Sequence, residues 1–316
     1  MEPQTTDTLT RIKENIERVI VGKSEAIDLV LICLLCGGHA LIEDVPGLGK
    51  TSLVSALADS IDCSFQRIQF TPDVLPSDVT GFTLYHPTTG ERQFYRGAVM
   101  SQIVLADEIN RTSPKTQSAL LQAMQEGVVT VDGETHRLPR PFMVCATQNP
   151  VEQTGTYPLP EAQLDRFLMR ISMGYPALAD EVTILERNKS RTATAPLSAV
   201  ADAAAILALQ DELEAMTCMR SILTYIVDIA RRTREHPDVE LGVSPRGSIA
   251  LMKAAMARAM LSGRNYVLPD DVQRMTAPVL AHRLVLTAQA YIQNQTAEAV
   301  LTEILRLAPV PAVTAG

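Results

Sequence analysis

A glycine-rich segment near the N-terminus contains the residue types of a phosphate-binding loop. Residues 41–52 read LIEDVPGLGKTS, and Gly49, Lys50 and Thr51 match the end of the pattern G-x-x-x-x-G-K-S/T. In such loops the backbone N–H groups face the phosphates, the lysine reaches the β- and γ-phosphates, and the hydroxyl binds Mg²⁺. Asp44 stands where the pattern has its first glycine, which weakens the match. For this segment alone, an ordinary glycine turn that caps a helix is an equal alternative.

A pair of acidic residues follows an apolar segment further along the chain. The segment IVLADEINR reads as a buried strand that ends in Asp107 and Glu108. Asp107 would hold Mg²⁺ through water, and Glu108 would polarise the attacking water. Two acids that merely leave a strand into solvent are the simpler alternative. The two motifs, in order and on successive strands of one sheet, make that coincidence improbable and predict a nucleotide site in spite of Asp44.

Three further polar residues fall where hydrolysis would need them. Asn149 follows the segment VCAT at a strand end, well placed to orient a water beside Glu108. Arg166 comes just before the next strand and could reach a neighbouring subunit. Arg246 follows a Ser-Pro pair at a helix start, which aims one cation at a fixed spot. A turn asparagine and two surface salt bridges are the alternatives for single residues, but beside the two motifs we favour the site.

The elements that must position these residues alternate between strands and helices. The spacing of apolar residues and the turn signals predict strands over residues 39–43, 64–70, 101–108, 141–147 and 166–173. Helices are predicted over residues 8–22, 23–38, 51–61 and 113–127, with Ser24 and Ser113 as possible N-caps. Residues 128–138 contain Asp132-Gly133 between β-prone runs and predict a hairpin, whereas residues 71–99 are rich in turn residues.

The pattern changes from about Pro176 onward. Long Ala- and Leu-rich segments dominate there and strands are no longer predicted, which indicates a helical second domain. We therefore expect an α/β fold, with a parallel-sheet nucleotide-binding core over residues 1–175 and an all-helical domain over residues 176–316.

Composition narrows the class of protein. The net charge of −8 and pI near 5.2 argue against a dedicated nucleic-acid binder, which usually has a basic face. The sequence shows no apolar run long enough for a membrane span and no signal-peptide pattern at its polar N-terminus, so we expect a cytoplasmic protein. Cys33 and Cys36 form a C-x-x-C inside an apolar helical run, without a second ligand pair, and are expected to pack in the core.

Several segments together resemble the MoxR-type AAA+ ATPases. They are EDVPGLGKT, ADEINRTSPKTQSALLQAMQEG, ATQNP, LPEAQLDRF and SPRGS, and the likeness covers nearly the whole chain. The resemblance implies a AAA+ P-loop core followed by a helical lid, with ATP and Mg²⁺ as cofactors. It also makes the turn-rich residues after Phe70 a helix-2 insert, and residues 128–138 the hairpin that precedes sensor 1.

The resemblance assigns a role to each candidate residue. The Walker A residues would be Lys50 and Thr51, and the Walker B residues Asp107 and Glu108, with Thr51 and Asp107 toward the metal. Sensor 1 would be Asn149, the arginine finger Arg166, and sensor 2 Arg246. The residues that would contact the nucleotide are Val21, Gly22, Pro46, Gly47, Leu48, Gly49, Lys50, Thr51, Ser52 and Asp107.

The resemblance also implies a mode of action. Related proteins form rings, usually hexamers, in which an arginine finger completes the neighbouring site, and they act as chaperone-like motors that mature partner enzymes. A von Willebrand A-domain protein is an expected partner. A nucleotide-gated scaffold with little turnover is the alternative, although it has no need of a positioned water. A DNA-translocating motor would fit the fold but not the acidic pI.

The predicted hairpin could line the pore of such a ring. His136, Arg137 and Arg140 are the candidates for contact with a substrate, and simple solvation of these side chains is an equal alternative.

Overall fold

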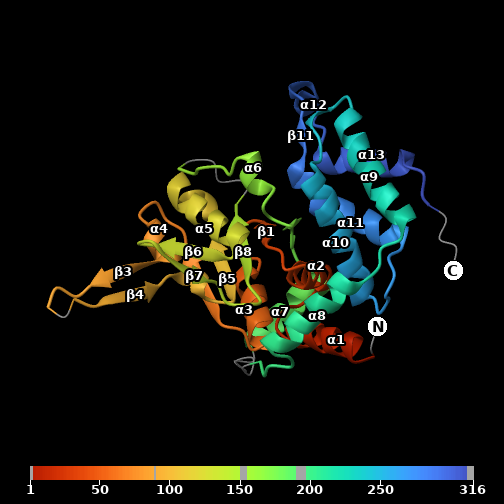
Figure 1. Cartoon of the computed structure of the whole chain (residues 1–316). Coiled ribbons are helices and arrows are strands. Elements are labelled where there is room, and N and C mark those ends of the chain that lie inside the picture. The colour runs from red at the N-terminus through yellow and green to blue at the C-terminus, as the bar shows by residue number, and fades with distance from the viewer. Residues whose placement is uncertain (1–2, 89, 150–154, 190–196, 312–316) are drawn as a thin grey trace.

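A five-stranded parallel sheet forms the centre of the first part of the chain (Figure 1). The computed structural model describes residues 3–88, 90–149, 155–189 and 197–311. The strand order is β2-β5-β8-β1-β9, and every neighbouring pair is parallel. The strands are β1 (Ala40–Glu43), β2 (Phe65–Gln69), β5 (Ile103–Asp107), β8 (Met143–Gln148) and β9 (Met169–Ile171). All five predicted strands are present, and their carboxyl ends meet at one edge.

Helices cover both faces of this sheet, and two apolar clusters result. On one face, alternate side chains such as Leu105 and Cys145 pack with α1 (Pro3–Glu17), α2 (Ser24–Leu35) and α3 (Lys50–Ser60). On the other face, Val104 and Val144 pack with α5 (Pro114–Glu126). Since the central strands are buried on both sides, they read as continuous apolar runs in the sequence.

The capping predictions differ in outcome. Ser113 caps α5, where its Oγ accepts a hydrogen bond of 3.3 Å from the Thr116 N–H. Ser24, in contrast, is the first residue of α2 and not its cap; Lys23 occupies that position without a side-chain cap bond. The Lys23 side chain instead donates to the carbonyls of Met173 and Gly174, at 2.8 Å each.

Two hairpins project from the core on the side away from the helical domain (Figure 1). The predicted hairpin is formed by β6 (Val128–Val131) and β7 (Glu134–Arg137). The turn-rich segment contains α4 (Pro76–Thr80), the short turn η1 (Ala98–Met100) and a second hairpin of β3 (Gly81–Tyr85) and β4 (Arg92–Arg96), which was not predicted. Its strands are short and largely exposed, so no apolar alternation marks them.

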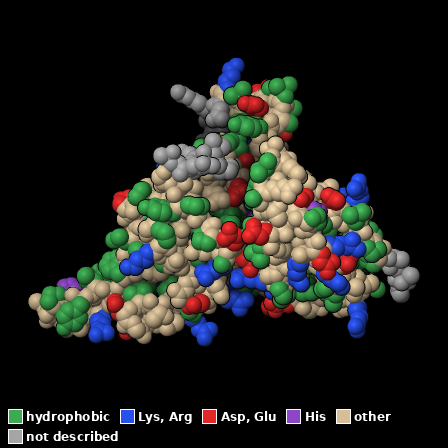
Figure 2. All heavy atoms as spheres, turned by 90° about the horizontal axis from the view of Figure 1, so that it is seen from above, with side chains coloured by type: hydrophobic (Ala, Val, Ile, Leu, Met, Phe, Trp, Pro, Cys, Tyr) green, Lys and Arg blue, Asp and Glu red, His purple; other side chains and the backbone are tan. Residues whose placement is uncertain are grey.

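The β3–β4 hairpin carries aromatic side chains on its surface. The rings of Phe82 and Tyr95 stack at 5.2 Å and are both exposed, and Figure 2 shows hydrophobic side chains at this end of the molecule. Phe94 stacks on His136 of the other hairpin at 3.9 Å. His136 therefore joins the two hairpins, whereas Arg137 and Arg140 are exposed.

The second part of the chain is helical, as predicted, and lies beside the sheet (Figure 1). Its helices are α7 (Leu178–Lys189), α8 (Ala203–Ala215), α9 (Arg220–Glu235), α10 (Pro245–Leu261), α11 (Pro269–Leu280), α12 (Ala288–Ile292) and α13 (Ala297–Leu307). The prediction that strands disappear here was wrong in one detail. Two short strands, β10 (Val239–Leu241) and β11 (Val285–Leu286), pair antiparallel, and they are too short to show any periodicity.

Two sequence expectations about the apolar segments can be compared with the structure. Cys33 is fully buried in the core and Cys36 packs against it, which confirms core packing for the C-x-x-C. Burial raises the pKa of Cys36 to about 12. Over the described residues, no helix has both the length and the apolar character needed to cross a bilayer.

Candidate functional site

The phosphate loop connects β1 to α3 at the carboxyl edge of the sheet. Gly49 is the N-cap of α3 with a φ of 84°, and Gly47 has a φ of 86°. No atom lies within 4 Å of a Cβ built on either glycine, so the left-handed backbone and not the available space requires glycine here. Pro46 and Gly47 are exposed, and Leu48 is half-buried. The predicted strand, loop and helix are all present, and the loop is open to a ligand.

Asp44, which departs from the usual pattern, turns its carboxylate away from this loop. The carboxylate accepts hydrogen bonds from Ser172 Oγ at 3.2 Å, from Gly174 N at 3.3 Å and from Met173 N. These donors belong to the segment that leads from β9 toward α7. Lys50 Nζ donates to the backbone carbonyl of Asp44 at 2.9 Å, a group that any residue would supply. The acidic side chain therefore does not block the loop.

Asp107 ends β5 and is bonded by both neighbouring strands. Thr147 of β8 donates its hydroxyl to Asp107 Oδ1 at 2.6 Å. Arg67 of β2 donates to Oδ2 through Nη2 at 2.7 Å and Nε at 3.2 Å. Neither partner was predicted from the sequence. Only the sheet order, which places β5 between β2 and β8, brings these segments together.

Glu108 follows with a left-handed backbone, at a φ of 57°. Such a conformation is costly for a residue with a side chain and is concentrated at functional sites. Its N–H donates to Thr147 Oγ1 at 2.9 Å, and its carboxylate accepts from Gln69 Nε2 at 2.8 Å. Arg111 lies 3.5 Å from the same carboxylate oxygen. The two acids are thus held at the sheet edge by fixed partners.

One expectation about the sheet was wrong. The strands of the phosphate loop and of Asp107 are not successive: β2 lies between them in the chain, and β8 separates them in space. The consequence favours the predicted site, because Asn149 directly follows β8. Gln148 pairs in register with Glu43, so Asn149 lies level with the start of the phosphate loop.

The chain's own donors fit Mg²⁺. A magnesium ion usually keeps several waters and takes one or two protein ligands together with phosphate oxygens. Thr51 lies in the first turn of α3, and among the described residues no hydrogen bond engages its hydroxyl. With Asp107 it offers one hydroxyl and one carboxylate. Within the described residues there is no cluster of three or more His, Cys, Asp or Glu that could hold a metal, so an ion here would depend on the nucleotide.

The candidate arginines lie where the core meets the helical domain. Arg166 is half-buried, and no described side chain pairs with it. The adjacent Asp165 lies 3.9 Å from Arg246 Nε of α10. The structure therefore brings the sensor 2 candidate next to the residue that precedes the finger candidate. Figure 2 shows acidic and basic side chains gathered at this junction.

A third arginine at this junction was missed by the sequence reading. Arg283 is buried and donates to Asp165 Oδ1 at 2.7 Å, to Phe167 O at 2.6 Å and to Leu168 O at 3.1 Å. Burial lowers its pKa, and the bond to Asp165 opposes that shift. Arg283 thus joins the helical domain to the segment that carries Arg166.

The segment expected on the adenine side also touches the second domain. Gly22 has a φ of 70°, and a Cβ built there would lie 2.1 Å from Asp180 Oδ2 of α7. The left-handed backbone favours glycine here, and a larger residue would also require the Asp180 side chain to move. Val21 is half-buried and Gly22 is exposed, so this segment meets the first turn of α7 but stays accessible.

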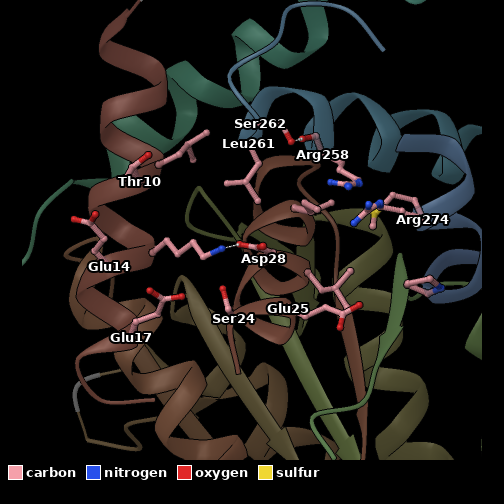
Figure 3. A pocket seen from close by; sticks show the side chains of 16 residues that line it. Thr10, Glu14, Glu17, Ser24, Glu25, Asp28, Arg258, Leu261, Ser262 and Arg274 are labelled. Carbon is pink, nitrogen blue, oxygen red and sulfur yellow. Dashed lines mark hydrogen bonds and ion pairs between the residues drawn. The ribbon is translucent and has the colours of Figure 1, made fainter. Parts of the chain in front are cut away.

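A separate cavity of about 960 Å³ lies between α1, α2, α10 and α11 (Figure 3). Lys13 and Asp28 form an ion pair of 2.6 Å within it, and Arg258 and Arg274 lie toward its other end. None of the predicted site residues lines this cavity. It is therefore distinct from the phosphate loop.

Comparisons with known proteins agree with this geometry. The ATPase family associated with various cellular activities (AAA) matches residues 39–169, and a AAA lid domain matches residues 231–304. The chain is 54% identical over 303 residues to the uncharacterised protein YeaC of Bacillus subtilis, covering 96% of this chain and 95% of that one. It is 39% identical to Chaperone MoxR1 of Mycobacterium tuberculosis, covering 98% and 84% respectively.

A solved structure from Cytophaga hutchinsonii, described as a candidate ATPase, has the same fold. Its TM-score is 0.91 at 36% identity, over 98% of this chain and 96% of that one.

Proposed function

The chain belongs to the MoxR family of AAA+ ATPases, and from this membership we propose that it hydrolyses ATP with Mg²⁺ to remodel partner proteins. The observation that carries the proposal is the pair Asp107 and Glu108, held at the sheet edge by Thr147 and opposite the phosphate loop. A protein that only bound nucleotide would not need a carboxylate fixed in a strained backbone conformation.

Each residue of the site has a role in this proposal. The backbone of the loop and Lys50 bind the β- and γ-phosphates, and Thr51 and Asp107 hold the ion. The ion, when bound, neutralises charge that develops on the phosphate oxygens. Glu108 accepts a proton from the attacking water, and Asn149 orients that water. The division of the chain into a core domain over residues 1–175 and a helical domain over residues 176–316 remains a prediction.

The proposed active assembly is a ring, with six subunits as the expected number. Arg166 supports this part of the proposal, because no described side chain of its own chain pairs with it. It is thus available to the nucleotide of a neighbouring subunit, while Arg246 acts within its own chain. An arginine supplied in this way contributes about 10³–10⁵ in rate in other nucleotide hydrolases.

The proposed task is chaperone-like maturation of a partner complex. The relative from Mycobacterium tuberculosis is named a chaperone. We expect a von Willebrand A-domain partner, a client enzyme complex, a cytoplasmic location and no nucleic-acid substrate, in keeping with the net charge of −8. Arg137 and Arg140 are exposed and stay candidates for substrate contact, whereas His136 already stacks on Phe94.

Phosphate release from Mg²⁺-ATP, measured over a range of protein concentrations, tests the proposal. Specific activity should rise with concentration and collapse in Arg166→Ala. Arg306→Ala, which removes the same charge from an exposed position on α13, is the matched control and should behave as the wild type.

Two other outcomes would change the conclusion. Nucleotide binding without turnover at any concentration would favour the nucleotide-gated scaffold. Activity that is independent of concentration and of Arg166 would contradict the ring.

A further inference from the structure

The two acidic residues of the site belong to a closed ring of hydrogen bonds. Glu108 N–H donates to Thr147 Oγ1, and that hydroxyl donates to Asp107 Oδ1. Arg67 donates both to Asp107 Oδ2 and, at 2.5 Å, to Gln69 Oε1. Gln69 Nε2 closes the ring by donating to the Glu108 carboxylate. Both carboxylates are therefore linked through one arginine.

The position of Arg67 follows from the geometry of β2. Residues two apart in a strand project from the same face, so Arg67 and Gln69 lie side by side. Gln69 pairs in register with Asp107, which places both side chains against the end of β5. Arg67 directs two N–H groups at a single oxygen of Asp107, and Thr147 occupies the other oxygen.

This arrangement conflicts with the role of Asp107 in the proposed function. An ion held by Asp107 through water needs an acceptor oxygen, and Oδ2 is already engaged by a guanidinium. Two cations would also repel each other across one carboxylate. Arg67 and Mg²⁺ therefore compete for Asp107.

We propose that Arg67 is a positioning residue that occupies Asp107 until Mg²⁺ replaces it. This inference rests on the proposed function.

The burial of the two partners indicates which one moves. The Arg67 side chain is 46% exposed, whereas that of Asp107 is only 13% exposed. The guanidinium can therefore turn into solvent at small cost, since exposed ion pairs contribute little. Asp107 stays fixed by Thr147 at 2.6 Å.

The test measures binding of a non-hydrolysable ATP analogue by calorimetry, once with Mg²⁺ and once with EDTA. The quantity of interest is the gain in affinity that Mg²⁺ gives. In Arg67→Gln this gain should rise about threefold to tenfold, the range for losing a partly exposed, doubly bonded competitor. Affinity in EDTA should match the wild type. Arg306→Gln controls for the lost charge and should leave the gain unchanged.

Two results would overturn the proposal. The first is a gain in Arg67→Gln that is equal to or below that of the wild type. The second is weaker binding in EDTA, which would make Arg67 a phosphate ligand. If Arg67→Gln does not fold, Arg67→Lys serves, because it keeps the charge but loses the two-pronged bond and should give a smaller rise.

Lys50→Ala tests the proposed function separately from the role of Arg67. It should lose nucleotide binding under both conditions. If Lys50→Ala bound the analogue like the wild type, the proposed function would fail whatever Arg67→Gln showed.

Discussion

Replacing Asp44 with glycine restores the usual phosphate-loop pattern, yet we expect the change to destabilise the protein. The Asp44 carboxylate is buried and accepts hydrogen bonds from Ser172, Met173 and Gly174. It therefore ties the start of the phosphate loop to the segment that leads into the helical domain. Glycine would leave all three donors without this acceptor.

The magnitude follows from the three contacts. A hydrogen bond to a charged group contributes about 1.5–3 kcal/mol, and the bonds from Ser172 and Gly174 are long, at 3.2 and 3.3 Å. Counting these two at less than the usual value, Asp44→Gly should lower the free energy of unfolding by about 2–4 kcal/mol. The midpoint of thermal unfolding should fall by roughly 3–6 °C. Asp44→Asn keeps one acceptor oxygen and should lose about half as much.

Thermal unfolding without nucleotide, together with calorimetric binding of an ATP analogue, measures both consequences. Lys50 bonds to the backbone carbonyl of residue 44, which glycine retains, so affinity should stay within about threefold. An Asp44→Gly protein as stable as the wild type would show that the three contacts contribute nothing. Loss of binding at unchanged stability would show instead that the carboxylate acts on the phosphate site.

Three further predictions concern the core, the domain junction and the site. Burial lowers the pKa of His39 from 6.5 to about 4. Between these two pH values the unfolded chain therefore binds a proton at His39, whereas the folded chain does not. The contribution of His39 to stability should be constant above pH 6.5 and fall by about 3 kcal/mol toward pH 4. In denaturant unfolding, His39→Gln should lose that part of the slope and keep the part due to His282, whose pKa burial also lowers. Arg283→Met should cost about 3–5 kcal/mol in denaturant unfolding, because it leaves Asp165 and two carbonyls without their donor; a cost below about 1 kcal/mol would contradict that role. Thr147→Val should lower kcat by about tenfold to 100-fold with little change in ATP affinity, and an unchanged kcat would refute its positioning role.

Much of the fold could be predicted because parallel strands and amphipathic helices leave strong local patterns. β5 and β8 are buried on both faces and appear as unbroken apolar runs, and α5 has Ser113 and Gly127 at its two ends. The β3–β4 hairpin and the pair β10–β11 escaped prediction because their strands are short and partly exposed. A strand that buries neither face lacks the alternation of apolar and polar residues from which strands are predicted.

The candidate site could be predicted only in part. Lys50, Asp107 and Glu108 belong to local motifs, since the chemistry of phosphate and water fixes their types and spacing. Arg67 and Arg283 belong to no such motif. Arg67 bonds to a residue 40 positions away, and Arg283 to one 118 positions away. Their roles depend on strand order and domain packing, and neither can be predicted from the spacing of residues along the chain.

The internal partners of the site residues affect how the measured affinity for nucleotide and Mg²⁺ should be interpreted. The groups expected to face the ligand bond to the protein itself: Lys50 to a backbone carbonyl, Asp107 to Arg67, and Glu108 to Gln69. A nucleotide and its ion must replace these bonds, so their measured affinity is a difference between two sets of contacts. Removing an internal partner that competes with the ion, such as Arg67, should therefore strengthen Mg²⁺-dependent binding, whereas removing a ligand-facing group should weaken binding. The direction of the change in affinity therefore distinguishes an internal partner from a ligand-facing residue, and a sequence motif alone does not make that distinction.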